Sequence, residues 1–147
     1  MSRRGDVACC GAALRALDID RVSVVHPPWF DDELNDAGAT YFLNQGFAVV
    51  ASVSADLPND PDRIESGAVI EWISRNVSDQ AEGVFIGGNG FRAARAIEQL
   101  EAKLGRPVLT ANQVLLWSIL AEVQADFEVN GYGRLFRQRP CTTDSAT

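Results

Sequence analysis

Four short runs of apolar residues alternate with longer segments of mixed polarity along the chain, and this alternation constrains the fold more than any other feature. We interpret the runs as buried strands, at residues 21–25 (RVSVV), 47–53 (FAVVASV), 83–86 (GVFI) and 107–110 (PVLT). Apolar strands that alternate with helices are typical of a parallel sheet covered by helices on both faces. The sequence therefore predicts an α/β fold, an open, doubly wound parallel sheet of about four strands.

Five segments are predicted to be helices: residues 8–17, 31–45, 64–76, 91–104 and 112–126. The acidic residues 31–33 suit the positive end of a helix, and Gly46 and Gly105 are of the type at which helices end. Residues 1–136 are expected to form a single domain. The polar residues 137–147 are expected to be a disordered tail.

Charge and composition exclude several classes of partner. The chain carries 20 Asp and Glu residues against 13 Lys and Arg residues, a formal net charge of −7. This balance argues against a broad basic surface for nucleic acid or for an anionic membrane. The longest apolar run, residues 114–121, is far shorter than the roughly 20 residues that span a bilayer, and no apolar signal segment follows the basic N-terminus. Because Cys9, Cys10 and Cys141 do not form a disulfide pattern, we expect a cytoplasmic protein.

Ligands of doubly wound sheets bind beyond the carboxyl ends of the strands, so the loops there are candidate binding segments. The strongest candidate is a glycine-rich loop between a strand and a helix, made up of Gly87, Gly88, Asn89 and Gly90. Glycines allow backbone N–H groups to approach a carboxylate or phosphate, and the following helix N-terminus favours negative charge. The alternative is a tight turn that needs positive φ angles. Arg92, in the first turn of that helix, is a candidate for an anion contact or a salt bridge.

Residues 88–93 of this segment also match the dinucleotide-binding pattern GxGxxG/A. That pattern requires an acidic residue at the end of the next strand, and residues 110–113 (TANQ) are neutral. The dinucleotide interpretation is therefore disfavoured.

Several single residues have two interpretations each. Trp29 either lines a pocket or covers the sheet edge, and Asn112 either caps the last helix or faces the cleft. Cys10 is either a thiol activated by a helix N-terminus or a small buried side chain. His26 is the only histidine, and no metal-ligand spacing surrounds it, so no metal site is predicted.

Four stretches of the chain resemble the maleate isomerase and arylmalonate decarboxylase branch of the aspartate/glutamate racemase superfamily. They are ALRALDIDRVSVV at 13–25, PPWFDDELN at 27–35, VFIGGNGFRAARAIEQLEAKLGRPVLTANQVLLW at 84–117 and GYGRLF at 131–136. Within that branch, GGNGFR and PPWFDDEL are similar to segments of ectoine-utilisation proteins. The resemblance covers nearly all of residues 8–136.

The resemblance implies one half of a two-domain fold, in which two pseudo-symmetric α/β halves face each other across a cleft. It implies a racemase, isomerase or decarboxylase that acts on a small carboxylate without a cofactor. Such enzymes use one or two thiols, and backbone N–H groups hold the substrate carboxylate. The candidate substrate-binding residues are then Gly87, Gly88, Asn89, Gly90, Trp29, Arg92 and Asn112.

The chain departs from the family pattern at the thiols. Gly88 stands where the resemblance places a cysteine, and Cys10 aligns with a segment that enters the inter-domain helix, so the catalytic residues are not identified. A catalytically inactive carboxylate-binding or assembly module, or a fragment of a two-domain enzyme, is the alternative to an enzyme. A lone half exposes the face that packs on its partner half, so we expect a homo-oligomer or a missing N-terminal half.

Overall fold

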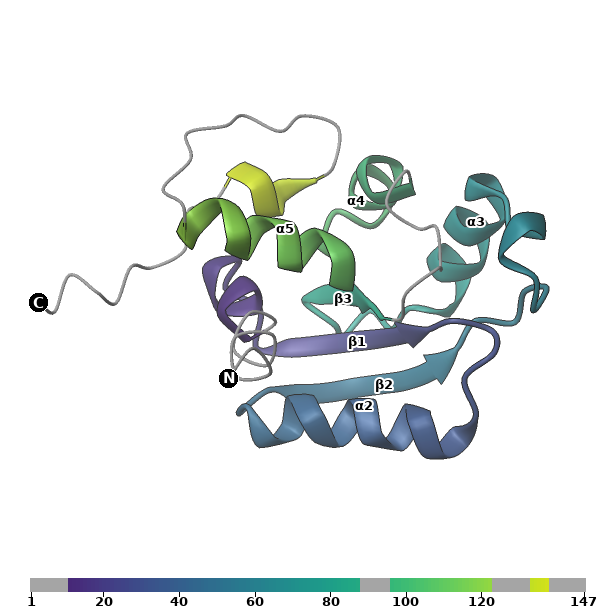
Figure 1. The fold of residues 1–147 in the computed structure, drawn as a ribbon, viewed down its shortest axis with the longest axis horizontal. Helices are drawn as coiled ribbons and strands as arrows, with labels where there is room; N and C mark the ends of the chain where they lie inside the picture. The colour runs from purple at the N-terminus through teal and green to yellow at the C-terminus, as the bar shows by residue number, and fades with distance from the viewer. Residues whose placement is uncertain (1–10, 88–95, 123–132, 138–147) are drawn as a thin grey trace, which may run out of the picture.

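The computed structural model describes residues 11–87, 96–122 and 133–137, which form an open α/β layer (Figure 1). Its strands are β1 (Arg21–His26), β2 (Ala48–Ser54), β3 (Gly83–Ile86) and β4 (Val108–Thr110). They form one sheet in the order β2-β1-β3-β4, and every neighbouring pair is parallel. The predicted four-stranded parallel sheet is therefore confirmed, with strand limits within one residue of those expected.

The helical segments are residues 11–16, α2 (Asp32–Asn44), α3 (Ser66–Asn76), α4 (Ile97–Leu104) and α5 (Ala111–Glu122), with 3-10 turns η1 (Pro61–Arg63) and η3 (Arg134–Arg137). Each predicted helix is present in the described residues. The third begins at Ser66 and not at residue 64, because η1 precedes it and Ile64 packs into the core. The predicted helical residues 8–10, 91–95 and 123–126 and the predicted tail from residue 138 lie outside the described residues.

Local signals in the sequence explain the ends of these helices. Asp31 is the N-cap of α2, and its carboxylate accepts a hydrogen bond of 2.9 Å from the N–H of Leu34. After α2 the chain turns at Gly46, whose φ is +93°, and α4 ends at Gly105, whose φ is +68°. Both glycines adopt the left-handed conformation that other residues avoid, so their predicted role in ending helices is confirmed.

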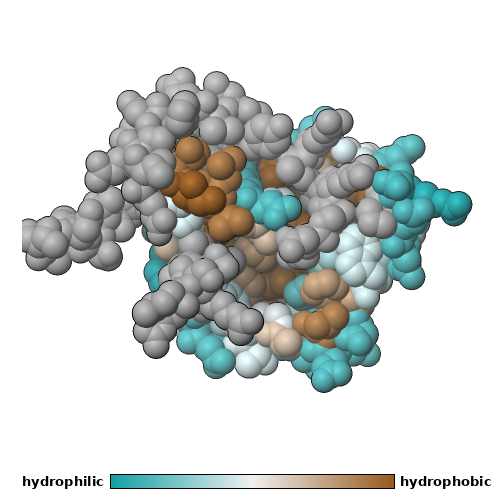
Figure 2. All heavy atoms as spheres, in the orientation of Figure 1, coloured by the Kyte–Doolittle hydropathy of each residue, from teal (hydrophilic) through white to brown (hydrophobic). Residues whose placement is uncertain are grey.

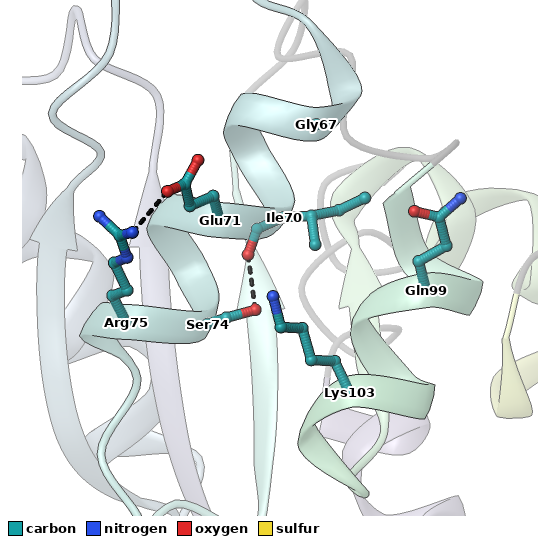
Figure 3. A pocket seen from close by; sticks show the side chains of 7 residues that line it. All are labelled: Gly67, Ile70, Glu71, Ser74, Arg75, Gln99 and Lys103. Atoms are coloured by element: carbon teal, nitrogen blue, oxygen red, sulfur yellow. Dashed lines mark hydrogen bonds and ion pairs between the residues drawn. The ribbon is translucent and has the colours of Figure 1, made fainter.

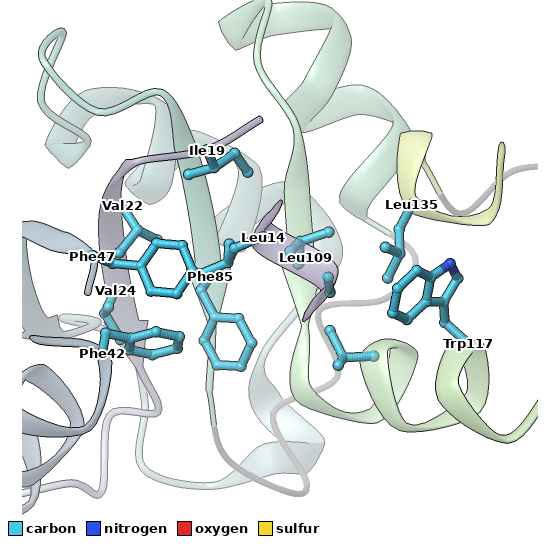
Figure 4. Close-up of a cluster of buried hydrophobic side chains, with 12 residues drawn as sticks. Leu14, Ile19, Val22, Val24, Phe42, Phe47, Phe85, Leu109, Trp117 and Leu135 are labelled. Atoms are coloured by element: carbon cyan, nitrogen blue, oxygen red, sulfur yellow. The ribbon is translucent and has the colours of Figure 1, made fainter. Parts of the chain in front are cut away.

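One face of the sheet packs against residues 11–16, α2, α5 and η3 (Figure 4). This first core contains Ala13, Leu14, Ile19, Val22, Val24, Phe42, Phe47, Phe85, Leu109, Val114, Trp117 and Leu135. Three ring pairs centred on Phe42 contribute to it, with Tyr41, Phe47 and Phe85 as the partners. Edge-to-face contacts of this kind add to the stabilisation that comes from burying the rings.

The opposite face packs against α3 and α4. This second core contains Val25, Ala55, Ile64, Val69, Ile73, Val84, Ile86, Ala96, Ile97, Leu100 and Val108. Successive residues of a strand contribute to opposite cores, as Val24 and Val25 of β1 do. Helices therefore cover both faces, and the predicted doubly wound arrangement is confirmed.

The last described segment, residues 133–137, packs back onto α4 and α5. Leu135 is fully buried in the first core, next to Trp117 (Figure 4). The carboxylate of Glu101 is buried and accepts hydrogen bonds from the N–H of Val108 at 2.9 Å and of Arg134 at 3.0 Å. A buried carboxylate needs such partners, so Glu101 fastens this segment and β4 to α4.

The outer side of α5 is apolar. Leu115, Leu116 and Ile119 are 44–47% exposed, and apolar side chains gather in the place that α5 occupies in the same view (Figure 2). Within the described residues, no helix combines the length and the apolar character that crossing a bilayer requires.

Candidate functional site

The strand order places a topological switch point between β1 and β3. The connection from β1 to β2 runs through α2 on the first-core face, whereas the connection from β3 to β4 runs through α4 on the opposite face. The connections that follow β1 and β3 therefore have their helices on opposite faces of the sheet, which defines the switch point. Ligands of open α/β sheets bind at such a point.

The structure brings His26 and Gly87 together at this switch point. His26 is the last residue of β1, and Gly87 follows the last residue of β3. The N–H of Gly87 donates a hydrogen bond of 2.8 Å to the carbonyl of Val25, which continues the pairing of the two strands. A Cβ placed at Gly87 would lie 3.5 Å from His26 Nδ1, an ordinary contact distance.

This hydrogen bond changes the interpretation of the glycine-rich loop. Because the Gly87 N–H already has a carbonyl acceptor, it is not available to an anion as the sequence suggested. The φ of Gly87 is also not in the left-handed region, so a turn that needs positive φ does not explain this glycine. The predicted anion contacts of Gly88, Asn89, Gly90 and Arg92 lie outside the described residues.

A hydrogen-bonded chain fixes the imidazole of His26. Its Nε2 lies 2.9 Å from Ser52 Oγ in β2, and that hydroxyl donates to the backbone carbonyl of Asn35 in α2 at 2.7 Å. Ser52 has a single hydroxyl proton, so Nε2 must carry the proton that it shares with Ser52. Nδ1 is then the nitrogen with the lone pair, and it is the nitrogen on the Gly87 side.

Burial sets the charge of this imidazole. His26 is 4% exposed, and its ring stacks on that of Phe30 with centroids 5.2 Å apart. Desolvation disfavours the imidazolium, so burial lowers the pKa of His26 below its ordinary value of 6.5. At neutral pH the ring is therefore mainly uncharged, and Nδ1 is the nitrogen that can accept a hydrogen bond.

A second serine holds the segment after β1 in place. Ser54 Oγ donates to the carbonyl of Phe30 at 2.7 Å and accepts from Asn35 Nδ2 at 2.9 Å. Sequence reasoning missed Ser52, Ser54 and Asn35. The two serines lie two residues apart in an otherwise apolar strand, and this alternation places both on one face of β2.

Of two grooves that described residues line, the one beside the serines does not suit a small anion. The first, of about 540 Å³, lies beside the serines and is lined by Phe30, Asp32, Asn35, Asp36, Ser52, Val53 and Ser54. Its two exposed aspartates repel negative charge. The second, of about 500 Å³, lies between α3 and α4 (Figure 3). There Glu71 already pairs with Arg75 at 2.6 Å, and Ser74 donates to the carbonyl of Ile70.

Two of the other predicted site residues are placed by the structure. Trp29 is half-buried and packs against the second core, where it contributes to folding. Asn112 is an exposed residue and the second residue of α5, so of its two interpretations the N-cap is wrong, because the helix begins at Ala111 and the residue before it is Thr110. Thr110 Oγ1 accepts from the N–H of Gln113 at 3.2 Å, and Gln113 Oε1 accepts from the N–H of Thr110 at 3.3 Å. This reciprocal pair is a capping box.

The three cysteines, Cys9, Cys10 and Cys141, lie outside the described residues. Within the described residues, no three His, Cys, Asp or Glu side chains are placed to hold a metal ion.

Several solved structures share this fold. Unliganded arylmalonate decarboxylase is 20% identical, with a TM-score of 0.81 over 90% of this chain and 59% of that chain. The maleate isomerase Iso from Pseudomonas putida S16 is 20% identical, with a TM-score of 0.79 over 89% and 53%. A Nocardia farcinica maleate cis-trans isomerase is 23% identical, with a TM-score of 0.77 over 88% and 53%. The chain thus spans little more than half the length of these relatives.

Sequence comparison gives the family directly. No curated protein sequence matches the chain. The family model described as arylmalonate decarboxylase matches residues 7–136, which include all the strands and all the described helices except part of η3. This chain belongs to the arylmalonate decarboxylase family.

Proposed function

We propose that this chain binds a small carboxylate at the switch point between β1 and β3 and handles it without a cofactor. The observation that carries the proposal is the meeting of His26 and Gly87 at that point, where open α/β sheets bind their ligands. Solved relatives are named for arylmalonate and maleate, both small carboxylates. Maleate and malonates are therefore the first candidate ligands, and the resemblance to ectoine-utilisation proteins adds ectoine breakdown products.

The reaction class proposed for this site is isomerisation or decarboxylation of the bound carboxylate. The Nocardia farcinica relative has been captured with a covalently bound succinylcysteine intermediate. In this chain Gly88 stands where the resemblance places a thiol, and Cys10 is the alternative thiol. The absence of a thiol at position 88 favours a second form of the proposal, a carboxylate-binding module without turnover.

Titration of the full chain with malonate, maleate, phenylmalonate and ectoine breakdown products tests binding. Calorimetry gives the affinity, and NMR follows the imidazole of the only histidine together with the Gly87 amide. We expect saturable binding that shifts both signals. Gly87→Leu fills the space beside His26 Nδ1 and is expected to abolish binding. Gly67→Leu is the matched control, because a Cβ at Gly67 meets no atom within 4 Å. No saturable binding at millimolar ligand contradicts the proposal.

Turnover is measured separately on the same ligands. Product formation that Cys10→Ser abolishes supports the enzyme form with Cys10 as the thiol. Binding without any product supports the binding module.

We also propose that α5 pairs with a second copy of this chain. Residues 111–121 contain no charged side chain, and α5 is apolar on its outer side as well as its inner side. A helix that is apolar all round is typical of a buried helix. In contrast, α2 and α3 expose charged residues such as Asp32, Asp36 and Arg75. Because a two-fold contact brings the same surface of both copies together, a patch without charge avoids repulsion between two acidic chains.

Light scattering and sedimentation test this pairing. We expect the chain to be dimeric and Leu116→Glu to be monomeric. Leu43→Glu is the matched control, since Leu43 on α2 is also exposed but outside the patch. A monomer at high concentration, or equal effects of the two substitutions, contradicts the pairing.

A further inference from the structure

We propose that His26 is the proton-accepting group of this site, and that Nδ1 takes up a proton when a small carboxylate binds beside Gly87. The inference rests on the proposed carboxylate binding at the switch point.

The first support is the direction of the imidazole. Ser52 holds Nε2 and requires that nitrogen to keep its proton, so only Nδ1 has a lone pair to offer. Nδ1 lies 3.5 Å from the position that a Cβ of Gly87 would occupy. Because Gly87 has no side chain, the space in front of Nδ1 at the switch point is not filled by this residue.

The second support is that close packing against α2 and Phe30 holds the ring in place. A Cβ at Gly38 of α2 would lie 2.5 Å from His26 Cε1, so the helix backbone packs closely against the ring. Phe30 stacks on the ring with an angle of 16° between the planes. An approaching carboxylate therefore meets an imidazole that is fixed in place, which keeps Nδ1 toward the ligand.

The third support is the neutral surroundings of the ring. Among the described residues, β2 contributes Ser52, α2 contributes Asn35 and Gly38, and the turn after β1 contributes Phe30. None of these side chains titrates, and Gly87 on the β3 side adds no charge.

The described carboxylates on the elements around His26 are exposed, and they are Asp31, Asp32, Glu33 and Asp36. Burial alone, and no neighbouring charge, lowers the pKa of His26. Among the described residues, the side chains that contact the ring are therefore uncharged at neutral pH, and the imidazole itself is mainly neutral.

A bound carboxylate reverses the preference of His26 for its neutral form. Its negative charge close to Nδ1 favours the imidazolium, and an opposite charge at about 4–6 Å shifts a pKa by about 1–3 units. A proton from solvent then forms the Nδ1–H bond with the lone pair of Nδ1, and the positive charge offsets that of the ligand. No oxidant, reductant or further reactant is required. The site consequently holds a transferable proton at Nδ1 only when it is occupied.

The test measures proton uptake and the His26 pKa in the full chain, with malonate as the probe. Calorimetry at about pH 7.5, above the ordinary pKa values of carboxylic acids, is run in buffers that differ in ionisation enthalpy. We expect uptake of up to one proton per malonate bound. We also expect a rise of about 1–3 units in the NMR-measured His26 pKa at saturating malonate, and no rise in sodium chloride of equal ionic strength.

His26→Gln removes the titratable imidazole but keeps a hydrogen-bond donor, because the glutamine amide can still donate to Ser52 and does not titrate. We expect this variant to bind malonate more weakly, with no proton uptake and no improvement in affinity as pH falls. In the parent chain the dissociation constant should fall as pH falls, by up to about tenfold per pH unit between the two His26 pKa values. Malonate binding with an unchanged His26 pKa, or proton uptake that persists in His26→Gln, overturns this inference alone. No malonate binding at all overturns the proposed function together with it.

Discussion

Gly38 of α2 packs directly against the imidazole of His26. A Cβ built at Gly38 would lie 2.5 Å from Cε1 and 2.9 Å from Nε2 of that ring. The glycine lies within a helix and is not required for a positive φ, so the close approach explains its presence. A glycine on one element thus sets the position of the histidine that ends the neighbouring strand.

Replacing Gly38 with alanine should destabilise the protein although alanine is the better helix former. Alanine gains about 1 kcal/mol over glycine within a helix. Against this, the new methyl group displaces a ring that is hydrogen-bonded to Ser52, and overpacking costs about 1–3 kcal/mol on top of a weakened hydrogen bond of about 1 kcal/mol. We expect a net loss of about 1–3 kcal/mol in the free energy of unfolding, measured with urea.

Gly67→Ala is the control for this substitution. Gly67 is also helical, but a Cβ there meets nothing within 4 Å, so we expect a gain of about 0.5–1 kcal/mol. Equal stabilisation by Gly38→Ala and Gly67→Ala would contradict this prediction, because it would show that the imidazole can move away from a methyl group at position 38 without a loss in the free energy of unfolding.

Stability should fall in two separate steps as the solution is acidified. Burial lowers the pKa of His26 below 6.5, so the unfolded chain takes up a proton at higher pH than the folded one. The free energy of unfolding therefore decreases as pH falls from about 6.5 toward the folded pKa of His26. Hydrogen bonds from the N–H groups of Asp20 and Arg21 lower the pKa of Glu82 below 4.5, so its contribution is present above that pH and is lost below it.

Single variants assign the two steps. In urea unfolding measured across this pH range, His26→Gln should remove the upper step and Glu82→Gln the lower one. An upper step that survives in His26→Gln assigns it to another group.

Most of the fold follows from local sequence signals. The four apolar runs became the four strands. The residues of β3 and β4, and of β1 after Arg21, are buried on both faces and so must be nearly continuously apolar, whereas the edge strand β2 is partly exposed. Asp31, Gly46 and Gly105 acted at the helix ends as their side chains or φ preferences require.

The candidate site was less predictable, because it depends on contacts between distant segments. The hydrogen bond of His26 to Ser52 joins residues 26 positions apart, and it exists only because β1 and β2 pair in register. The acceptor of the Gly87 N–H likewise depends on the register of β1 with β3. The capping residue of α5 was predictable in principle, since Thr110 and Gln113 have capping-box spacing, but Asn112 is an equally good N-cap residue by type.

Substitutions at the start of α5 should distinguish the two capping interpretations. Thr110→Ala removes the acceptor of the Gln113 N–H and should cost about 1 kcal/mol in the free energy of unfolding. Gln113→Ala leaves the Thr110 N–H without its side-chain acceptor and should cost a similar amount. Asn112→Ala should change stability by less than about 0.5 kcal/mol, because that side chain is exposed. A larger loss from Asn112→Ala than from Thr110→Ala would restore Asn112 as the cap.

Gly133→Ala should loosen the C-terminal segment more than its backbone angle alone requires. Gly133 and Gly105 both have positive φ, at +92° and +68°, so alanine is strained at either position by about 1 kcal/mol. At Gly105 a Cβ meets nothing within 4 Å, whereas at Gly133 it would lie 2.6 Å from Ile97 Cγ2 and 2.9 Å from Glu101 Oε2. That carboxylate accepts a hydrogen bond from the Arg134 N–H. The added methyl group must therefore either displace α4 or weaken the hydrogen bond between Glu101 and Arg134.

We therefore expect Gly105→Ala to lose about 1 kcal/mol in the free energy of unfolding and Gly133→Ala to lose about 2–4 kcal/mol. Hydrogen exchange at the Arg134 amide locates the effect, since its N–H is protected by Glu101 only while the segment is docked. Exchange should accelerate in Gly133→Ala and stay unchanged, relative to global stability, in Gly105→Ala. If the two variants lose the same stability and keep the same Arg134 protection, residues 133–137 do not depend on the close packing of Gly133 against α4.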